Sequence, residues 1–233
     1  MSRRPRIHFP GAVYHVMVRG NAGLPVFFID ADRLRFYLFL QEAIERFECR
    51  VHAFCCMTTH IHLAIQIADI SLSRIMQNLS VRYTAWINRS HHRAGHLFQG
   101  RFKAILIDAD NHLLELVRYI HLNPVRAAMV TKPGDYPWSG HRAYLGLEVL
   151  PWLTTDWVLS MLSAKKSISR RKYCQFVAEG LTDSERQELH GGSCDGRILG
   201  SEDFVDTALR KGCQRDRRPV SFEEMSTEEE FFG

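Results

Sequence analysis

The chain has 233 residues, of which 45% are hydrophobic and 24% are charged, and this composition is that of a folded globular protein, not of a disordered one. No segment approaches the roughly 18 consecutive apolar residues of a membrane span, and no apolar stretch of signal-peptide type follows the basic N-terminus, so we expect a soluble intracellular protein. The six cysteines have irregular spacings without a CxxC pair, which argues against a disulfide framework or a cysteine zinc site and favours reduced thiols.

The net charge of +4 is small, but the charged residues are distributed unevenly. Arginines concentrate in the N-terminal and central parts of the chain, whereas glutamates gather over residues 223–230 in a short acidic tail. A basic core indicates a polyanionic partner such as nucleic acid, although solvated helix faces have a similar composition. The motifs therefore have to decide the function.

Alternating β-branched residues predict strands, and apolar residues at helical spacing predict helices. In chain order these patterns give a strand at 12–20, a helix at 30–47, a hairpin of strands at 49–57 and 60–67, a helix at 71–91 and a strand at 100–108. The order strand, helix, strand, strand, helix, strand is typical of a ferredoxin-like α+β fold. We expect an antiparallel sheet with helices on one face.

One more helix is predicted at 111–123, where Pro124 ends it. Beyond residue 150 the pattern changes to short helical pieces joined by glycine-rich and serine-rich connections. These pieces are predicted at 154–163, 169–180 and 201–211. We therefore predict two units, a core over 1–150 and a small helical extension with the acidic tail over 151–233.

The third predicted strand begins with His60-Ile61-His62. Because side chains alternate along a strand, His60 and His62 point to the same face, with the two imidazoles about 7 Å apart along the strand. Such a pair suits chelation of a divalent cation. The alternative is that one or both rings merely face solvent, and a metal site needs a third ligand.

The helix before Pro124 supplies a candidate ligand. Tyr119 and Asn123 are four residues apart and share one helix face, whereas Leu113, Leu116, Val117 and Ile120 form the stripe that would pack on the sheet. Asn123 offers an amide oxygen to a hard cation, and Tyr119 offers a phenolic oxygen one turn away. A tyrosine at such a position is also common as plain packing.

Five strings in this order resemble the single-tyrosine HUH transposases, specifically the REP-associated kind found in bacterial chromosomes. They are YHVMVRGN, HIH, GHLFQGRFKAILID, RYIHLNPVRAAMV and DYPWSGHRAYLG. The resemblance covers residues 5 to about 147, and its most specific part is the nine-residue string from Arg118 to Arg126, which matches the family's nucleophile helix in register. Residues 198–209 are similar to a C-terminal extension that some longer members carry.

The resemblance implies a chemistry. His60, His62 and Asn123 would hold Mg²⁺ or Mn²⁺, and Tyr119 would attack a phosphate of single-stranded DNA to leave a 5′-phosphotyrosine link. It also implies hairpin-forming palindromic repeats as the DNA, a monomer or homodimer as the active form, and a bacterial cytoplasmic, nucleoid-associated location. The residues expected to contact DNA are Arg19, Asn21, Arg82, Arg101, Lys103, Arg118 and Arg126.

Three hypotheses from different classes follow. The first is a metal-dependent single-strand DNA endonuclease and strand transferase. The second is a catalytically silent DNA-binding protein that recognises repeat hairpins. The third is an RNA or nucleotide phosphoesterase with two His-x-Thr motifs, which the sequence disfavours because it contains one such cluster and that cluster reads His-Ile-His.

Overall fold

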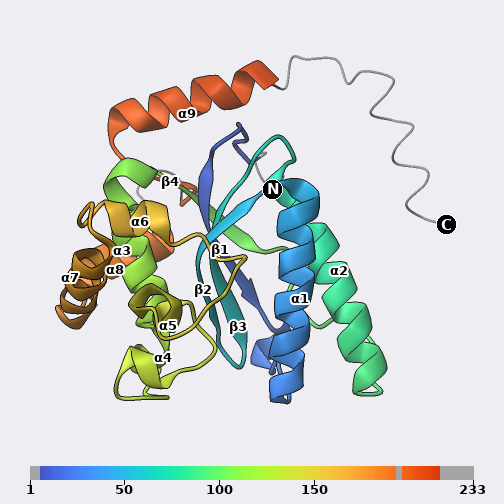
Figure 1. Cartoon of the computed structure of the whole chain (residues 1–233). Helices are drawn as coiled ribbons and strands as arrows, with labels where there is room; N and C mark the ends of the chain where they lie inside the picture. The colour runs from blue at the N-terminus through green and yellow to red at the C-terminus, as the bar shows by residue number, and fades with distance from the viewer. Residues whose placement is uncertain (1–5, 193–195, 216–233) are drawn as a thin grey trace.

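The computed structural model describes residues 6–192 and 196–215, and its centre is a sheet with the strand order β2-β3-β1-β4-β5 (Figure 1). The strands are β1 (Val13–Arg19), β2 (Arg50–Cys56), β3 (His60–Gln66), β4 (Lys103–Ile107) and β5 (Ile198–Leu199). The first four pair antiparallel, which confirms the predicted α+β, ferredoxin-like arrangement. The short β5 joins β4 in parallel and makes the sheet mixed.

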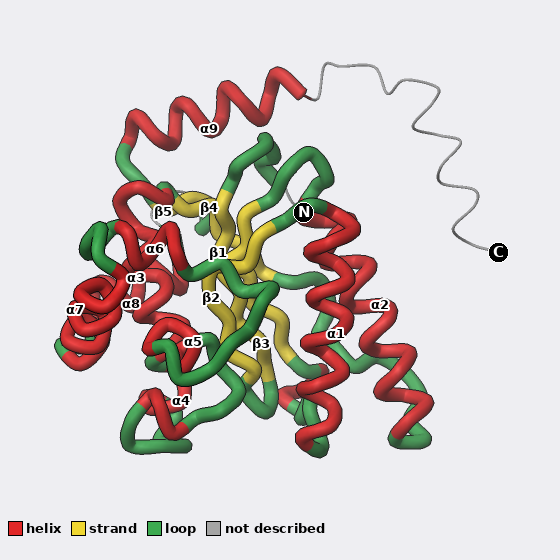
Figure 2. The backbone as a smooth tube through the Cα atoms, in the orientation of Figure 1, coloured by secondary structure: helices red, strands yellow, loops and turns green. Residues whose placement is uncertain are grey.

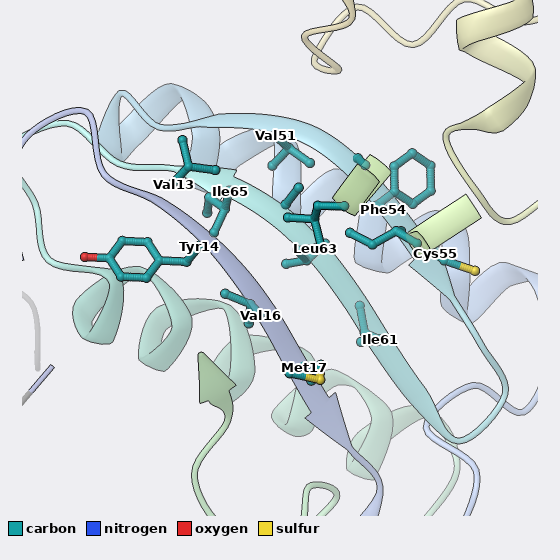
Figure 3. Close-up of a cluster of buried hydrophobic side chains, with 14 of the residues drawn as sticks. Val13, Tyr14, Val16, Met17, Val51, Phe54, Cys55, Ile61, Leu63 and Ile65 are labelled. Atoms are coloured by element: carbon teal, nitrogen blue, oxygen red, sulfur yellow. The ribbon is translucent and has the colours of Figure 1, made fainter. Parts of the chain in front are cut away.

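Helices α1 (Asp30–Phe47) and α2 (Leu72–Ser90) lie side by side on one face of the sheet (Figure 1). The Ser71 hydroxyl caps α2 by accepting a hydrogen bond from the Arg74 backbone, and the buried Asp32 carboxylate accepts the backbone N–H groups that precede α1. Figure 3 shows the buried side chains of β1, β2 and β3, among them Val16 and Leu63, which are paired across the two central strands.

Helix α3 (Ala109–His121) covers the opposite face, and after Leu122 the short α4 (Asn123–Arg126) begins. All four apolar residues of the predicted stripe, Leu113, Leu116, Val117 and Ile120, are fully buried. The two helices of the core βαββαβ unit thus share one face, as expected, while α3 gives the sheet helices on its second face. The histidine pair of β3 points to this second face.

The C-terminal extension contributes α6 (Asp156–Ser160), α7 (Lys166–Ala178), α8 (Asp183–Gly191) and α9 (Glu202–Arg215), and Figure 2 shows α7 and α8 beside α3. The short α5 (His141–Leu145) precedes the extension and lies within the predicted core. Helices α5 and α8 and strand β5 were not predicted, because each is short and depends on tertiary contacts. The boundary near residue 150 stays a prediction, and the acidic tail at 223–230 lies outside the described residues.

The state of the cysteines and the character of the helices bear on two expectations from the sequence. The four cysteines whose side chains are described, Cys49, Cys55, Cys56 and Cys174, are free thiols, and the first three are buried. Within the described ranges, no helix combines the length and the apolar character that crossing a membrane requires.

Candidate active site

The two histidines of β3 stand next to each other on the sheet face that α3 covers. Their ring centres are 5.0 Å apart, closer than the 7 Å rise between alternate residues because the rings turn toward each other. Antiparallel pairing with β1 places His60 opposite Arg19 and His62 opposite Met17. His62 is buried, whereas His60 is half-buried and is the first residue of β3.

Both imidazoles are held neutral by their surroundings. Burial lowers the pKa of His60 to about 4, and the nearby cations Arg19 and Arg126 act in the same direction. The pKa of His62 lies well below its usual range, chiefly through burial and then through the neighbouring His15. Neutral rings keep a nitrogen lone pair at pH 7, which is the form of histidine that binds a metal ion.

A third histidine, which the sequence patterns did not identify, completes this cluster. His15 of β1 is fully buried, its Nε2 lies 3.0 Å from His62 Nδ1, and its Nδ1 lies 2.8 Å from the carbonyl oxygen of Leu189 in α8. A lone histidine inside an apolar strand is the only local sign of such a role. Its relation to His62 becomes visible only once β1 is known to pair with β3.

Tyr119 lies in the last turn of α3 with its ring against this histidine cluster. The ring centre is 5.4 Å from that of His15 and 5.9 Å from that of His62, both in edge-to-face geometry. The residue is only 3% exposed, and no described residue forms a hydrogen bond with its hydroxyl group. The phenol ring is therefore held beside the imidazoles by ring contacts and not by a hydrogen bond of its hydroxyl group.

Asn123 is the first residue of α4 and is fixed by the end of α3. Its Nδ2 donates to the carbonyl oxygens of Tyr119 and Ile120 at 3.0 and 3.2 Å. Because carbonyl oxygens only accept, the amide orientation is determined, and Oδ1 points away from the helix end. That oxygen accepts a hydrogen bond of 2.7 Å from Arg126, whose guanidinium also lies 4.1 Å from the Tyr119 ring centre.

These side chains have the chemistry of a divalent cation site. Among the described residues, no group of three histidine, cysteine or acidic side chains has the arrangement of a metal site. A site built on His60 and His62 therefore needs a neutral third ligand, and the orientated Oδ1 of Asn123 is of the right type. Two neutral imidazoles and one amide oxygen are ligand types that divalent cations accept.

Several predicted DNA-contacting residues surround this cluster. Arg19 lies opposite His60 in the β1–β3 pairing, Arg126 lies over the Tyr119 ring, and both cations lower the pKa of His60. Lys103 of β4 donates from Nζ to the carbonyl oxygen of His190 at 2.5 Å. Sequence reasoning missed His190, whose side chain is largely exposed. Its pKa is lowered, first by partial burial of the ring and then by the charges of Lys103, Arg19 and Arg126. The extension thus places a neutral histidine beside a cationic rim formed by Arg19, Lys103 and Arg126.

The other predicted DNA contacts lie elsewhere. Arg82 pairs with Glu42 of α1 and lies over the Phe39 ring, on the sheet face opposite the histidines. Arg118 is buried, with its guanidinium 3.1 Å from the Glu185 carboxylate and 3.9 Å from the Phe176 ring centre, so it is engaged inside the protein.

Asn21 and Arg101 are both exposed. The backbone N–H of Asn21, in a short 3-10 helix (Asn21–Gly23), donates to the Leu97 carbonyl oxygen. The structure therefore does not bring all seven predicted DNA contacts together at the histidine site.

Comparison with known proteins assigns this site to a family. Residues 9–123 match the family described as Transposase IS200 like, and they include all the cluster residues from His15 to Asn123. A Haemophilus influenzae protein that carries the name REP-associated tyrosine transposase is 27% identical over 128 residues, which cover 50% of this chain and 71% of that protein. The solved structure of a REP-associated tyrosine transposase bound to a REP hairpin aligns with a TM-score of 0.55 at 19% identity, over 66% of this chain and 92% of that one.

The part of the chain that carries the site, residues 9–123, is therefore similar to the IS200-like transposases. The chain is also similar to a REP-associated tyrosine transposase, which confirms the resemblance found in the sequence. The structural alignment supports the fold itself.

Proposed function

We propose that the protein is a metal-dependent single-stranded DNA endonuclease and strand transferase that acts on hairpin-forming palindromic repeats through a 5′-phosphotyrosine intermediate. The observation that carries this proposal is the packing of Tyr119 against His62, with Arg126 across its ring. One face of the sheet thus holds a nucleophile, candidate metal ligands and a cation within one cluster.

The residues have distinct roles in this reaction. His60, His62 and Asn123 would hold Mg²⁺ or Mn²⁺, which when bound polarises and orients the scissile phosphate. The Tyr119 oxygen attacks the phosphorus and the new O–P bond replaces the bond to the 3′ oxygen; the phenol releases its proton to water, and the departing 3′ oxygen takes up a proton from water to become the hydroxyl. Arg126 places a positive charge where negative charge develops on the phenol and the phosphate.

The products are a DNA 5′ end linked to Tyr119 and a free 3′ hydroxyl. Attack of a 3′ hydroxyl on the phosphotyrosine reverses the step and joins strands without ATP, because the bond energy is kept in the covalent intermediate. This two-step scheme provides cleavage and transfer with one nucleophile, in a monomer or in a homodimer.

The cationic rim supports DNA as the substrate. Arg19, Lys103 and Arg126 border the cluster from three elements, and exposed cations in such an arrangement contact backbone phosphates. A related transposase is bound to a REP hairpin, and we extend that class of DNA to this chain. The phosphoesterase alternative requires His-x-Thr motifs, and the sequence contains no His-x-Thr triplet.

The proposal is tested with labelled single-stranded DNA that carries the hairpin repeats flanking the gene. We expect site-specific cleavage with Mn²⁺, none with chelator, and none with His60→Ala. The matched control is His92→Asn, which changes an exposed histidine outside the cluster and should cleave normally. Hairpin binding without cleavage in the wild type under every metal condition would instead favour a catalytically silent DNA-binding protein.

A further inference from the structure

The C-terminal end of α8 contacts the candidate metal site through its backbone. The last four carbonyl groups of a helix lack partners within the helix and need donors from elsewhere. Here the Leu189 carbonyl accepts from His15 Nδ1 at 2.8 Å, and the His190 carbonyl accepts from Lys103 Nζ at 2.5 Å. Both donors come from the sheet of the core, so the extension is bonded directly to the strands that surround the site.

The first of these contacts determines where the protons lie. A carbonyl oxygen only accepts, so Nδ1 of His15 must carry a hydrogen. A neutral imidazole has one N–H, which leaves Nε2 of His15 as an acceptor. The atom that faces it at 3.0 Å is His62 Nδ1, which must therefore be the donor. His62 consequently has its lone pair on Nε2.

We propose that His15 is a positioning residue for metal binding, and that the extension acts through Leu189 to set the tautomer of His62. This inference rests on the proposed function, because it takes His62 as a ligand of Mn²⁺ or Mg²⁺ through Nε2. The chain of hydrogen bonds runs from the Leu189 carbonyl to His15 and from His15 to His62. It fixes both the ring orientation and the nitrogen that is free to bind the ion.

Packing alone does not account for this arrangement. His15 is fully buried and both of its nitrogens are bonded, whereas a purely apolar contact with the Tyr119 ring would need neither bond. Phenylalanine would preserve a flat ring at this position and lose both hydrogen bonds. Glutamine would keep an oxygen that accepts from His62 Nδ1. The two variants therefore separate ring packing from hydrogen bonding.

The test uses the full chain and two measurements. In the metal-free wild type, ¹⁵N NMR of labelled histidines should show the Nδ1–H tautomer for both His15 and His62. Calorimetric titration with MnCl₂ alone should show an affinity about 10 to 100 times weaker in His15→Phe than in the wild type, the range found when a residue supporting a metal ligand is removed. His15→Gln should recover most of this loss. The matched control is His52→Phe, because His52 is another buried histidine with both nitrogens bonded, and it should leave Mn²⁺ affinity unchanged.

The outcomes distinguish failure of the proposed metal chemistry from failure of the role proposed for His15. If the wild type binds no Mn²⁺, both the proposed metal chemistry and the role of His15 fail. If the wild type binds Mn²⁺ and His15→Phe binds it equally well, only the role of His15 is overturned. An Nε2–H tautomer of His62 in the NMR spectrum overturns it as well, even if the phenylalanine variant does not fold.

Discussion

The guanidinium of Arg126 lies 4.1 Å from the centre of the Tyr119 ring and donates to Asn123 Oδ1 at 2.7 Å. One side chain therefore contacts both the proposed nucleophile and a proposed metal ligand. The three residues lie within eight positions of the chain, at the junction between α3 and α4. This junction brings the proposed nucleophile, the proposed ligand and the cation together within one short segment of the chain.

Replacing Arg126 by alanine should reduce the DNA cleavage rate by about 100-fold, because a preorganised cation is lost from the reacting phosphate. The slope of the logarithm of the DNA-binding constant against that of salt concentration should fall by about one. Arg126→Lys should recover the slope more than the rate, since lysine keeps the charge without the planar guanidinium. Arg171→Ala, which removes an exposed charge from α7, is the control and should change neither quantity by more than a small amount.

Arg118→Ala should lower the stability of the protein and leave DNA binding unchanged, in contrast to Arg126→Ala. This side chain packs on Phe176 and pairs with the partly exposed Glu185, so its loss should lower the free energy of unfolding by about 1–2 kcal/mol, mostly through lost packing, because solvent screens the ion pair. The salt dependence of DNA binding should not change. Urea denaturation and binding titrations would check both quantities. A smaller salt slope at unchanged stability would show that Arg118 contacts DNA after all.

Because His141 is buried, the free energy of unfolding should decrease in acid. Its pKa is lowered to about 4 by burial, while an imidazole in an unfolded chain has a pKa of about 6.5. Between these values the unfolded state binds a proton that the folded state excludes, so the free energy of unfolding falls as the pH falls from 6.5 to 4. At pH 5 this one residue should account for about 2 kcal/mol of the loss relative to pH 8.

Denaturation of His141→Gln with chelator present should show a pH-dependent loss that is smaller by about that amount. His92→Asn changes an exposed histidine and should retain the steep wild-type profile. An unchanged profile in His141→Gln would mean that His141 titrates normally in the folded protein.

Sequence periodicity predicted those parts of the site that local spacing determines. His60 and His62 are alternate residues of one strand, and Tyr119 and Asn123 are one helical turn apart, so each pair could be assigned to a common face. The contact of His15 with His62 depends instead on strand pairing, and the contact of His15 with Leu189 joins residues 174 positions apart. No local pattern carries such information.

Arg118 shows the converse problem. Its basic character and its position next to Tyr119 indicated a DNA contact, but adjacent helix residues point about 100° apart around the axis. Arg118 therefore points toward the extension while Tyr119 points toward the histidines. Its partner Glu185 lies 67 residues further along the chain, which sequence spacing cannot anticipate.

The extension should stabilise the core. It buries Tyr173 and Leu189 against core residues, and the Tyr173 hydroxyl is bonded to His121 of α3. We expect a chain that ends at residue 150 to keep the secondary structure of the four-stranded core but to melt at least about 10 °C lower, since several buried contacts are lost at about 1.5–3 kcal/mol each. Circular dichroism would measure both. An unchanged melting temperature would show that the two units are energetically independent.

In the proposed mechanism Tyr119 becomes covalently linked to the 5′ end of cleaved DNA. The most direct measurement is mass spectrometry of the protein after incubation with Mn²⁺ and the flanking hairpin DNA, followed by mapping of the modified peptide. The account predicts a mass increase equal to the 5′-linked DNA fragment, located at Tyr119 and missing in Tyr119→Phe, which should still bind the hairpin. An adduct at another residue, or cleavage by Tyr119→Phe at the wild-type rate, would contradict it.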